Sequence, residues 1–98
     1  MVTRRTLADL DGDERHATVF DDPRTVRLAL SAGESVPPHS HPEAVVLLHV
    51  LDGSLDATIG GDPYAFRAGE LVRFDGFEEI ALTATVDTTA IVVLTPRP

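Results

Sequence analysis

Residues 33–53 read GESVPPHSHPEAVVLLHVLDG. The apolar run within them is rich in valine and leucine, which favour strands, and the Asp52-Gly53 that follows is typical of a tight turn between antiparallel strands. Upstream of the run, Gly33 permits a sharp turn and Pro37-Pro38 restricts the backbone to an extended conformation. We therefore predict an extended segment that carries two histidines, followed by a strand over residues 45–51.

Comparable short runs of branched and aromatic residues recur along the rest of the chain, and turn-forming residues such as Gly60-Gly61 and Asp75-Gly76 separate them. No stretch beyond residue 15 has a sustained helical period. A series of short strands separated by turns is typical of an all-β sandwich or barrel. The predicted strands cover residues 15–20, 25–30, 45–51, 55–59, 64–67, 71–74, 80–86 and 89–95.

The length of 98 residues and the absence of a linker, a repeat or a low-complexity segment predict a single domain. We assign residues 15–98 to the barrel and residues 1–14 to an N-terminal arm. Within that arm, residues 3–11 could form one helical turn or an extended chain. The arm is expected to be flexible, or to pack on the barrel or on a partner.

The composition excludes several classes of protein. The net charge of −8 includes no lysine, and such an acidic surface repels phosphate backbones and anionic lipids. There is no cysteine for a disulfide or a thiolate metal site, and no apolar stretch approaches the roughly 20 residues needed to span a bilayer. Because no apolar segment follows Arg4-Arg5, we expect no signal peptide and a cytoplasmic domain. The acidic, lysine-free composition fits solubility at high salt, or a GC-rich genome.

Two apolar runs, residues 45–48 and 90–94, are continuous rather than alternating. A strand that is apolar on both faces is covered on both faces. In a barrel only one face looks inward, so the outer face needs a second cover. We predict a homodimer on this basis, with the chain's own terminal arm as the alternative cover.

The candidate chemistry lies on His39-Ser40-His41. Histidines at positions i and i+2 of an extended chain point to the same face, a few ångströms apart, so both imidazoles can reach one metal ion at about 2.0–2.1 Å. Two histidines that line a binding site without a metal would show the same pattern. Ser40 is expected to point to the opposite face.

The stretch from Gly33 to Pro42, with Gly53 beyond it, resembles the first conserved motif of the cupins. In that family a glycine, five residues, His-x-His, three or four residues, a glutamate, six residues and a glycine follow one another. Gly69-Glu70 and Asp75-Gly76 resemble later family turns, and the resemblance extends over residues 15–95. It implies a double-stranded β-helix, or jelly-roll barrel, in a small single-domain cupin.

The chain departs from the family's metal-ligand pattern at two positions. Val46 stands where the resemblance places a glutamate, and Glu79 stands where it places the last histidine. Two histidines and a carboxylate can still hold non-haem iron. The resemblance therefore implies that His39, His41 and Glu79 could bind a divalent ion such as Fe, Mn, Ni or Zn.

The third ligand has alternatives. Counting from the motif selects Glu79, whereas side-chain alternation places Glu78 on the same face as Ile80 and Leu82. Glu43, two residues after His41, is a further alternative ligand. All three carboxylates could instead be solvated charges at turns.

Other residues have less specific roles. His49 lies within an apolar run and is interpreted as a core or dimer-interface residue, and nothing ties His16 to the site. Strand arginines could hold an anionic substrate inside the barrel or pair with surface carboxylates; these are Arg27, Arg67 and Arg73. The candidate pocket-lining residues are Val46, Leu48 and Phe74.

Two functions follow from these observations. One is a metal-dependent cupin that acts on a small organic molecule, as dioxygenase-like or isomerase-like cupins do. The other is a non-catalytic, metal-free cupin that binds a small molecule as a sensor or carrier. No motif names a substrate or a reaction.

Overall fold

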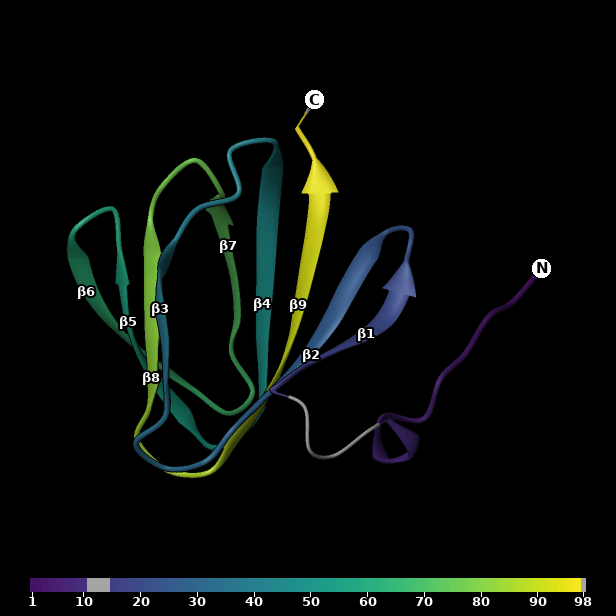
Figure 1. Cartoon of the computed structure of the whole chain (residues 1–98), viewed down its shortest axis with the longest axis horizontal. Coiled ribbons are helices and arrows are strands. Elements are labelled where there is room, and N and C mark those ends of the chain that lie inside the picture. The colour runs from purple at the N-terminus through teal and green to yellow at the C-terminus, as the bar shows by residue number, and fades with distance from the viewer. Residues whose placement is uncertain (11–14, 98) are drawn as a thin grey trace.

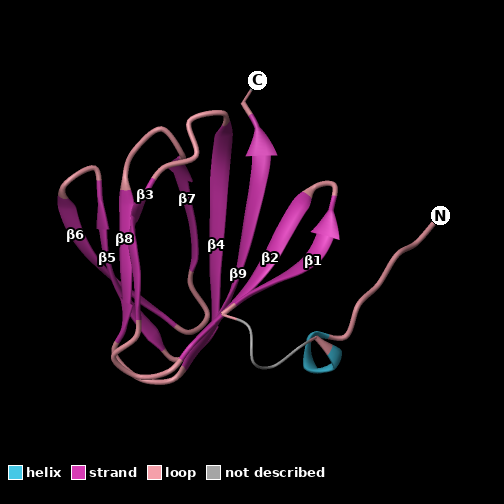
Figure 2. Cartoon of the chain, viewed as in Figure 1, coloured by secondary structure: helices cyan, strands magenta, loops and turns pink. Residues whose placement is uncertain are grey.

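The chain folds into two antiparallel β-sheets that face each other (Figure 1). A computed structural model describes residues 1–10 and 15–97. Within those residues, one sheet has the strand order β1-β2-β9-β4-β7 and the other has the order β3-β8-β5-β6. Figure 2 shows that strands, drawn in magenta, make up most of the chain apart from its N-terminal residues. The strands are β1 (His16–Asp21), β2 (Arg24–Leu30), β3 (Ser35–His39), β4 (Ala44–Asp52), β5 (Ser54–Ile59), β6 (Asp62–Arg67), β7 (Leu71–Asp75), β8 (Ile80–Ala84) and β9 (Thr88–Pro96).

The two-sheet architecture confirms the predicted all-β jelly-roll barrel. Each of the eight predicted strands is present, with small shifts at its ends. The sequence did not predict β3 as a separate strand, because Pro37 and Pro38 lack the N–H groups that a ladder requires. β3 is an edge strand of its sheet, and its pairing with β8 is irregular between Val36 and His39. Both features allow prolines in a strand.

Side-chain alternation along each strand creates the interior. On β4, Val46, Leu48 and Val50 are buried between the sheets, whereas Leu47 and His49 point to the other face and are half-buried. The same alternation on the facing strands contributes the remaining core. The buried cluster comprises Leu28, Leu30, Val36, Leu48, Val50, Leu55, Ala57, Ile59, Phe66, Ile80, Leu82, Ala84 and Ala90.

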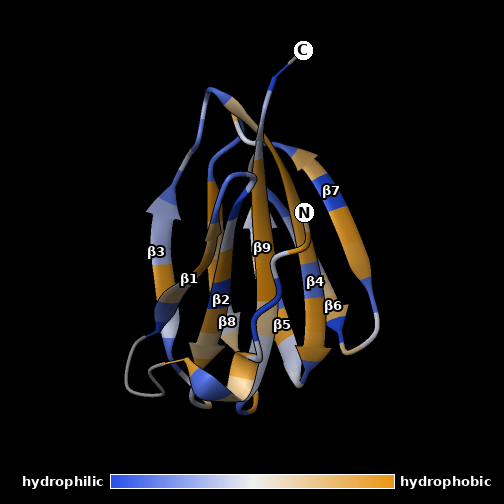
Figure 3. Cartoon of the chain, turned by 90° about the vertical axis from the view of Figure 1, so that its right-hand side faces the viewer, coloured by the Kyte–Doolittle hydropathy of each residue, from blue (hydrophilic) through white to orange (hydrophobic). Residues whose placement is uncertain are grey.

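The outer face of the five-stranded sheet is also apolar. Figure 3 shows hydrophobic residues along β9 and β4 in the view toward this sheet. Leu47 and Val93 are paired there and are half-buried. The predicted homodimer would cover this face, and it stays a prediction.

The N-terminal residues 1–10 lie outside the same sheet (Figures 1 and 3). They contain one short 3₁₀ helix, Leu7–Asp9, and both Leu7 and Leu10 are half-buried. The predicted arm and barrel include residues 11–14 and 98, which lie outside the described residues. In the described part of the chain, no helix has the length and apolar character needed to cross a membrane.

From the packing of the core we expect alanine substitutions at two leucines to differ strongly in their effect on stability. Leu55 is 0% exposed and Leu71 is 67% exposed. Leu55→Ala should lower the free energy of unfolding by about 2–5 kcal/mol, because it leaves a cavity in packed surroundings. The matched control Leu71→Ala should cost less than about 0.5 kcal/mol, as exposed substitutions usually do. Equal losses in urea denaturation would contradict this assignment of the core.

Candidate functional site

A cavity of about 520 Å³ lies between the two sheets. Its wall is mostly apolar and includes Val46, Leu48 and Phe74, the three residues that the sequence suggested as pocket-lining. Leu28 and Leu48 are each only 1% exposed, so the cavity extends into the packed interior. The other apolar lining residues are Val26, Val36, Pro37, Ile80, Leu82, Val92 and Leu94.

Four nitrogen-bearing side chains interrupt this apolar wall. They are His16, Arg24, His39 and His41, and Thr18 is the remaining polar residue. Among the described residues, no aspartate or glutamate lines the cavity. Its polar groups therefore include cationic and neutral side chains but no anionic ones, although the chain as a whole has a net charge of −8.

The rings of His39 and His41 lie close together. Their centroids are 5.0 Å apart and their planes meet at 82°. The Nδ1 atom of His39 lies 2.9 Å from the carbonyl oxygen of Pro37. Because a carbonyl oxygen only accepts hydrogen bonds, Nδ1 carries the proton and donates it, which leaves Nε2 as the acceptor or metal-binding atom of the neutral ring.

Backbone hydrogen bonds hold the loop that carries His41. The His41 N–H donates to the Gly76 carbonyl over 2.7 Å, and the Gly76 N–H donates to the Ala44 carbonyl over 2.9 Å. A Cβ atom on Gly76 would overlap the His41 carbonyl oxygen and lie 2.7 Å from the Ala44 carbonyl oxygen. Glycine at position 76 therefore allows the β7–β8 turn to approach the loop and fix the position of His41.

The basic groups of the cavity affect one another electrostatically. Burial, then His39, then Arg24 lower the pKa of His41 below its ordinary value. Burial, then His39, then Arg15 lower the pKa of His16. The three histidines and Arg24 line the same cavity, which gives their charges the opportunity to interact. Arg15 itself pairs with Glu34, 2.6 Å away.

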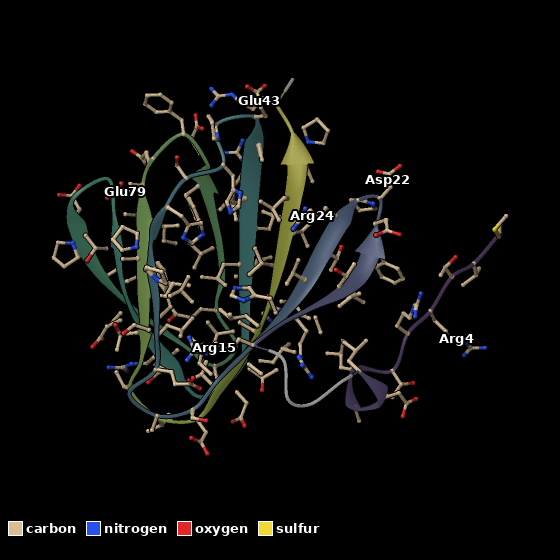
Figure 4. The ribbon with its side chains drawn as sticks, in the orientation of Figure 1. Arg4, Arg15, Asp22, Arg24, Glu43 and Glu79 are labelled. Carbon is tan, nitrogen blue, oxygen red and sulfur yellow. The ribbon has the colours of Figure 1, made fainter. Side chains whose placement is uncertain are left out.

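The structure does not bring Glu79 or Glu78 to the two motif histidines. Both carboxylates are exposed, and neither lines the cavity. Figure 4 shows Glu79 at the start of β8, toward the β5–β6 hairpin, where its carbonyl accepts the Gly60 N–H over 2.9 Å. Ile80 lines the cavity, so alternation directs Glu79 outward. Glu78 lies in the β7–β8 turn, and its carboxylate lies beside Gly60 of the β5–β6 hairpin.

The other candidates also lie elsewhere. Glu43 is exposed in the β3–β4 loop near the C-terminus (Figure 4). His49 is half-buried on the face of β4 opposite the cavity. Of the three arginines suggested for the barrel, Arg67 and Arg73 are exposed, and Arg27 is buried but outside the cavity lining.

Sequence reasoning missed His16 and Arg24 as cavity residues. On β2, Arg24 has the same parity as Val26, which is buried and lines the cavity, so alternation could have found Arg24. On β1 the buried residues are Ala17 and Val19, so alternation would have placed His16 on the opposite face. The family motif could have found neither residue, because it begins further along the chain.

The described residues do not supply the donor set of the family's metal centre. No group of three histidine, cysteine, aspartate or glutamate side chains in this part of the chain is arranged to hold a metal ion. Val46 contributes an apolar wall where the family pattern has a carboxylate. His39 and His41 are therefore the two family-like donors that remain at the cavity.

The comparison with protein families identifies the chain. Residues 26–95 match the cupin domain family, which is most of the sequence, so the chain belongs to the cupins. The resemblance seen in its motif is thereby confirmed. A search of curated proteins finds no significant match.

Solved structures share this fold at low sequence identity. KdgF from Halomonas sp. has a TM-score of 0.77 at 19% identity, over 92% of this chain and 87% of that one. A protein of unknown function from Rhizobium leguminosarum has a TM-score of 0.78 at 17% identity, over 99% of both chains. A predicted oxalate decarboxylase from Thermotoga maritima has a TM-score of 0.68 at 20% identity, over 82% of this chain and 79% of that one. These similarities establish the fold alone.

The lowered pKa values of His16 and His41 predict a pH-dependent stability. Their folded forms bind a proton less readily than the unfolded chain, whose histidines titrate near 6.5. The free energy of unfolding should therefore fall as the pH drops from about 7.5 to about 5.5. The double variant His16→Gln/His41→Gln should flatten this dependence in urea titrations.

The control for this experiment is His49→Gln, which alters a histidine on the other face of β4. It should keep the wild-type slope. A double variant with an unchanged slope would contradict the electrostatic cluster. The pH range of this experiment lies above the range in which Glu34 titrates, because the Ser31 N–H is the main cause that lowers the pKa of Glu34 from 4.5.

The close approach of Gly76 predicts a specific effect on the loop. Gly76→Ala should cost about 1–3 kcal/mol of stability through overpacking, and it should shift the side-chain NMR signals of His41. Gly61→Ala is the control, because a Cβ there meets nothing within 4 Å. It should leave the His41 signals in place, even though its φ of +88° strains an alanine. Unchanged His41 signals in Gly76→Ala would contradict the positioning role.

Proposed function

We propose that this cupin binds a small organic molecule, with the apolar body of that molecule held in the barrel cavity. The observation that carries the proposal is the cavity itself, about 520 Å³ in volume and walled by apolar side chains from both sheets. Ligand pockets are commonly about 300–1,000 Å³, mostly apolar, and supplied with a few convergent polar groups. This cavity has all three properties.

The wall is well suited to a preformed site. Leu28 and Leu48 contribute almost fully buried surfaces, and both belong to the core cluster. Packed strands on both sides hold these side chains in place, so binding requires little ordering of the protein. A ligand that displaces water from such a wall gains free energy from the burial of its own apolar surface.

A metal-dependent activity is the second candidate, and the proximity of His39 and His41 favours it. A bound Fe, Mn, Ni or Zn ion would act there as a Lewis acid. The described residues offer two histidines without a nearby carboxylate, so they do not fit the family's donor set. We therefore place ligand binding, rather than metal chemistry, at the centre of the proposal.

The fluorescent probe N-phenyl-1-naphthylamine, which is uncharged and emits strongly in apolar surroundings, tests the cavity. It should bind the wild-type protein. Val46→Phe should weaken its binding about tenfold or more, because the larger ring occupies cavity volume. Val45→Phe makes the same change on the opposite face of β4 and should leave the affinity unchanged.

Circular dichroism must show that both variants are folded. Equal affinity in Val46→Phe and Val45→Phe would contradict binding in the barrel. The same titration after dialysis against a chelator separates the two candidate functions: unchanged affinity is expected here. Stoichiometric metal that is lost in His39→Ala/His41→Ala, together with probe binding that depends on it, would favour the metal-dependent candidate.

A further inference from the structure

The charges around the cavity are distributed unlike those of the chain as a whole. Acidic residues outnumber basic ones by 16 to 8, yet none of the described acidic side chains lines the cavity. The lining instead includes Arg24 and three histidines that come from both sheets. A neutral, apolar ligand would leave the arginine and the histidines without a partner, whereas an anionic group could pair with them.

Arg24 is the permanent charge in this set. It is the first residue of β2, and Figure 4 shows it between β2 and β9. Arg24 and His41 line the same cavity, and the charge of Arg24 contributes to the lowered pKa of that ring. Asp21 is its partner in the β1–β2 register. Within the described residues, however, the ion pairs are Arg15–Glu34 and Arg97–Asp75, so Arg24 lies at the cavity without a carboxylate partner.

We propose that the ligand of this cavity is a small organic carboxylic acid, whose carboxylate pairs with Arg24 and whose hydrocarbon body occupies the apolar barrel. This inference rests on the proposed function, since it assigns the chemical class of the same ligand. The planar guanidinium offers a fork of N–H donors that matches the two oxygens of a carboxylate.

The surrounding groups support one anionic group and an apolar remainder. His41 can donate a ring N–H to an acceptor beside Arg24, and His16 offers a second donor from β1. The rest of the lining is mainly apolar and includes Val26, Leu28 and Leu82. A carboxylate at the polar groups and a hydrocarbon chain against the apolar wall satisfy both parts of the surface.

The test compares octanoate with 1-octanol, which share a hydrocarbon chain and differ in charge. Each is titrated against bound N-phenyl-1-naphthylamine at neutral pH and low salt, and the measured quantity is the ratio of the two displacement constants. Arg24 is exposed, so Arg24→Gln should reduce the preference for octanoate roughly two- to fivefold, as expected for an exposed charge pair. Displacement by 1-octanol should be unchanged.

Two further variants make the result specific. Arg73→Gln removes an exposed arginine outside the cavity lining and should keep the wild-type ratio. Arg24→Lys retains the charge but loses the guanidinium fork, so it should keep part of the preference for octanoate and lose less of it than Arg24→Gln. A loss in Arg24→Lys as large as that in Arg24→Gln would show that charge is not the cause, and would overturn the proposal.

The outcomes separate this inference from the proposed function. If both compounds displace the probe and Arg24→Gln leaves the ratio unchanged, the carboxylate assignment is wrong and binding in the cavity stands. If the probe binds but neither compound displaces it from the wild-type protein, the assignment is also wrong. If the probe itself does not bind the wild-type protein, the proposed function fails, and this inference fails with it.

Discussion

The pairing of β4 with β9 organises the rest of the molecule. Across their inner faces Val46 is opposite Leu94 and Leu48 is opposite Val92, and these four side chains line the cavity. A shift of either strand by one residue would turn that strand's two cavity-lining side chains outward. The same strands also extend into the packed end of the barrel, where Val50 is opposite Ala90. One ladder therefore provides both the stable core and the binding surface.

The site combines that rigid wall with a loop held by backbone contacts. Gly76 accepts from the His41 N–H and donates to the Ala44 carbonyl, so the β7–β8 turn and the β3–β4 loop position each other. This arrangement fixes His41 without using its side chain. The imidazole remains available to the cavity, beside His39 at a centroid distance of 5.0 Å.

The fold was largely predictable from the sequence because strand alternation and turn residues are local signals. β3 was the exception, since Pro37-Pro38 masks an edge strand that pairs with β8. The motif predicted that His39 and His41 share one face, and both line the cavity in the structure. It could not locate Glu79, because a residue just before β8 points outward once Ile80 points into the cavity.

By itself the sequence determined the all-β class, the strand segments other than β3 and the pair of histidines on one extended segment, and its resemblance to the cupins implied the jelly roll. The strands and the histidine pair depend on neighbours within a few residues. Only the tertiary structure decided that His16 and Arg24 reach the same cavity as His39 and His41, and that the described carboxylates stay outside it. These residues are far apart in the chain. The packing of β1 and β2 against the rest of the barrel determines which of their side chains share a cavity.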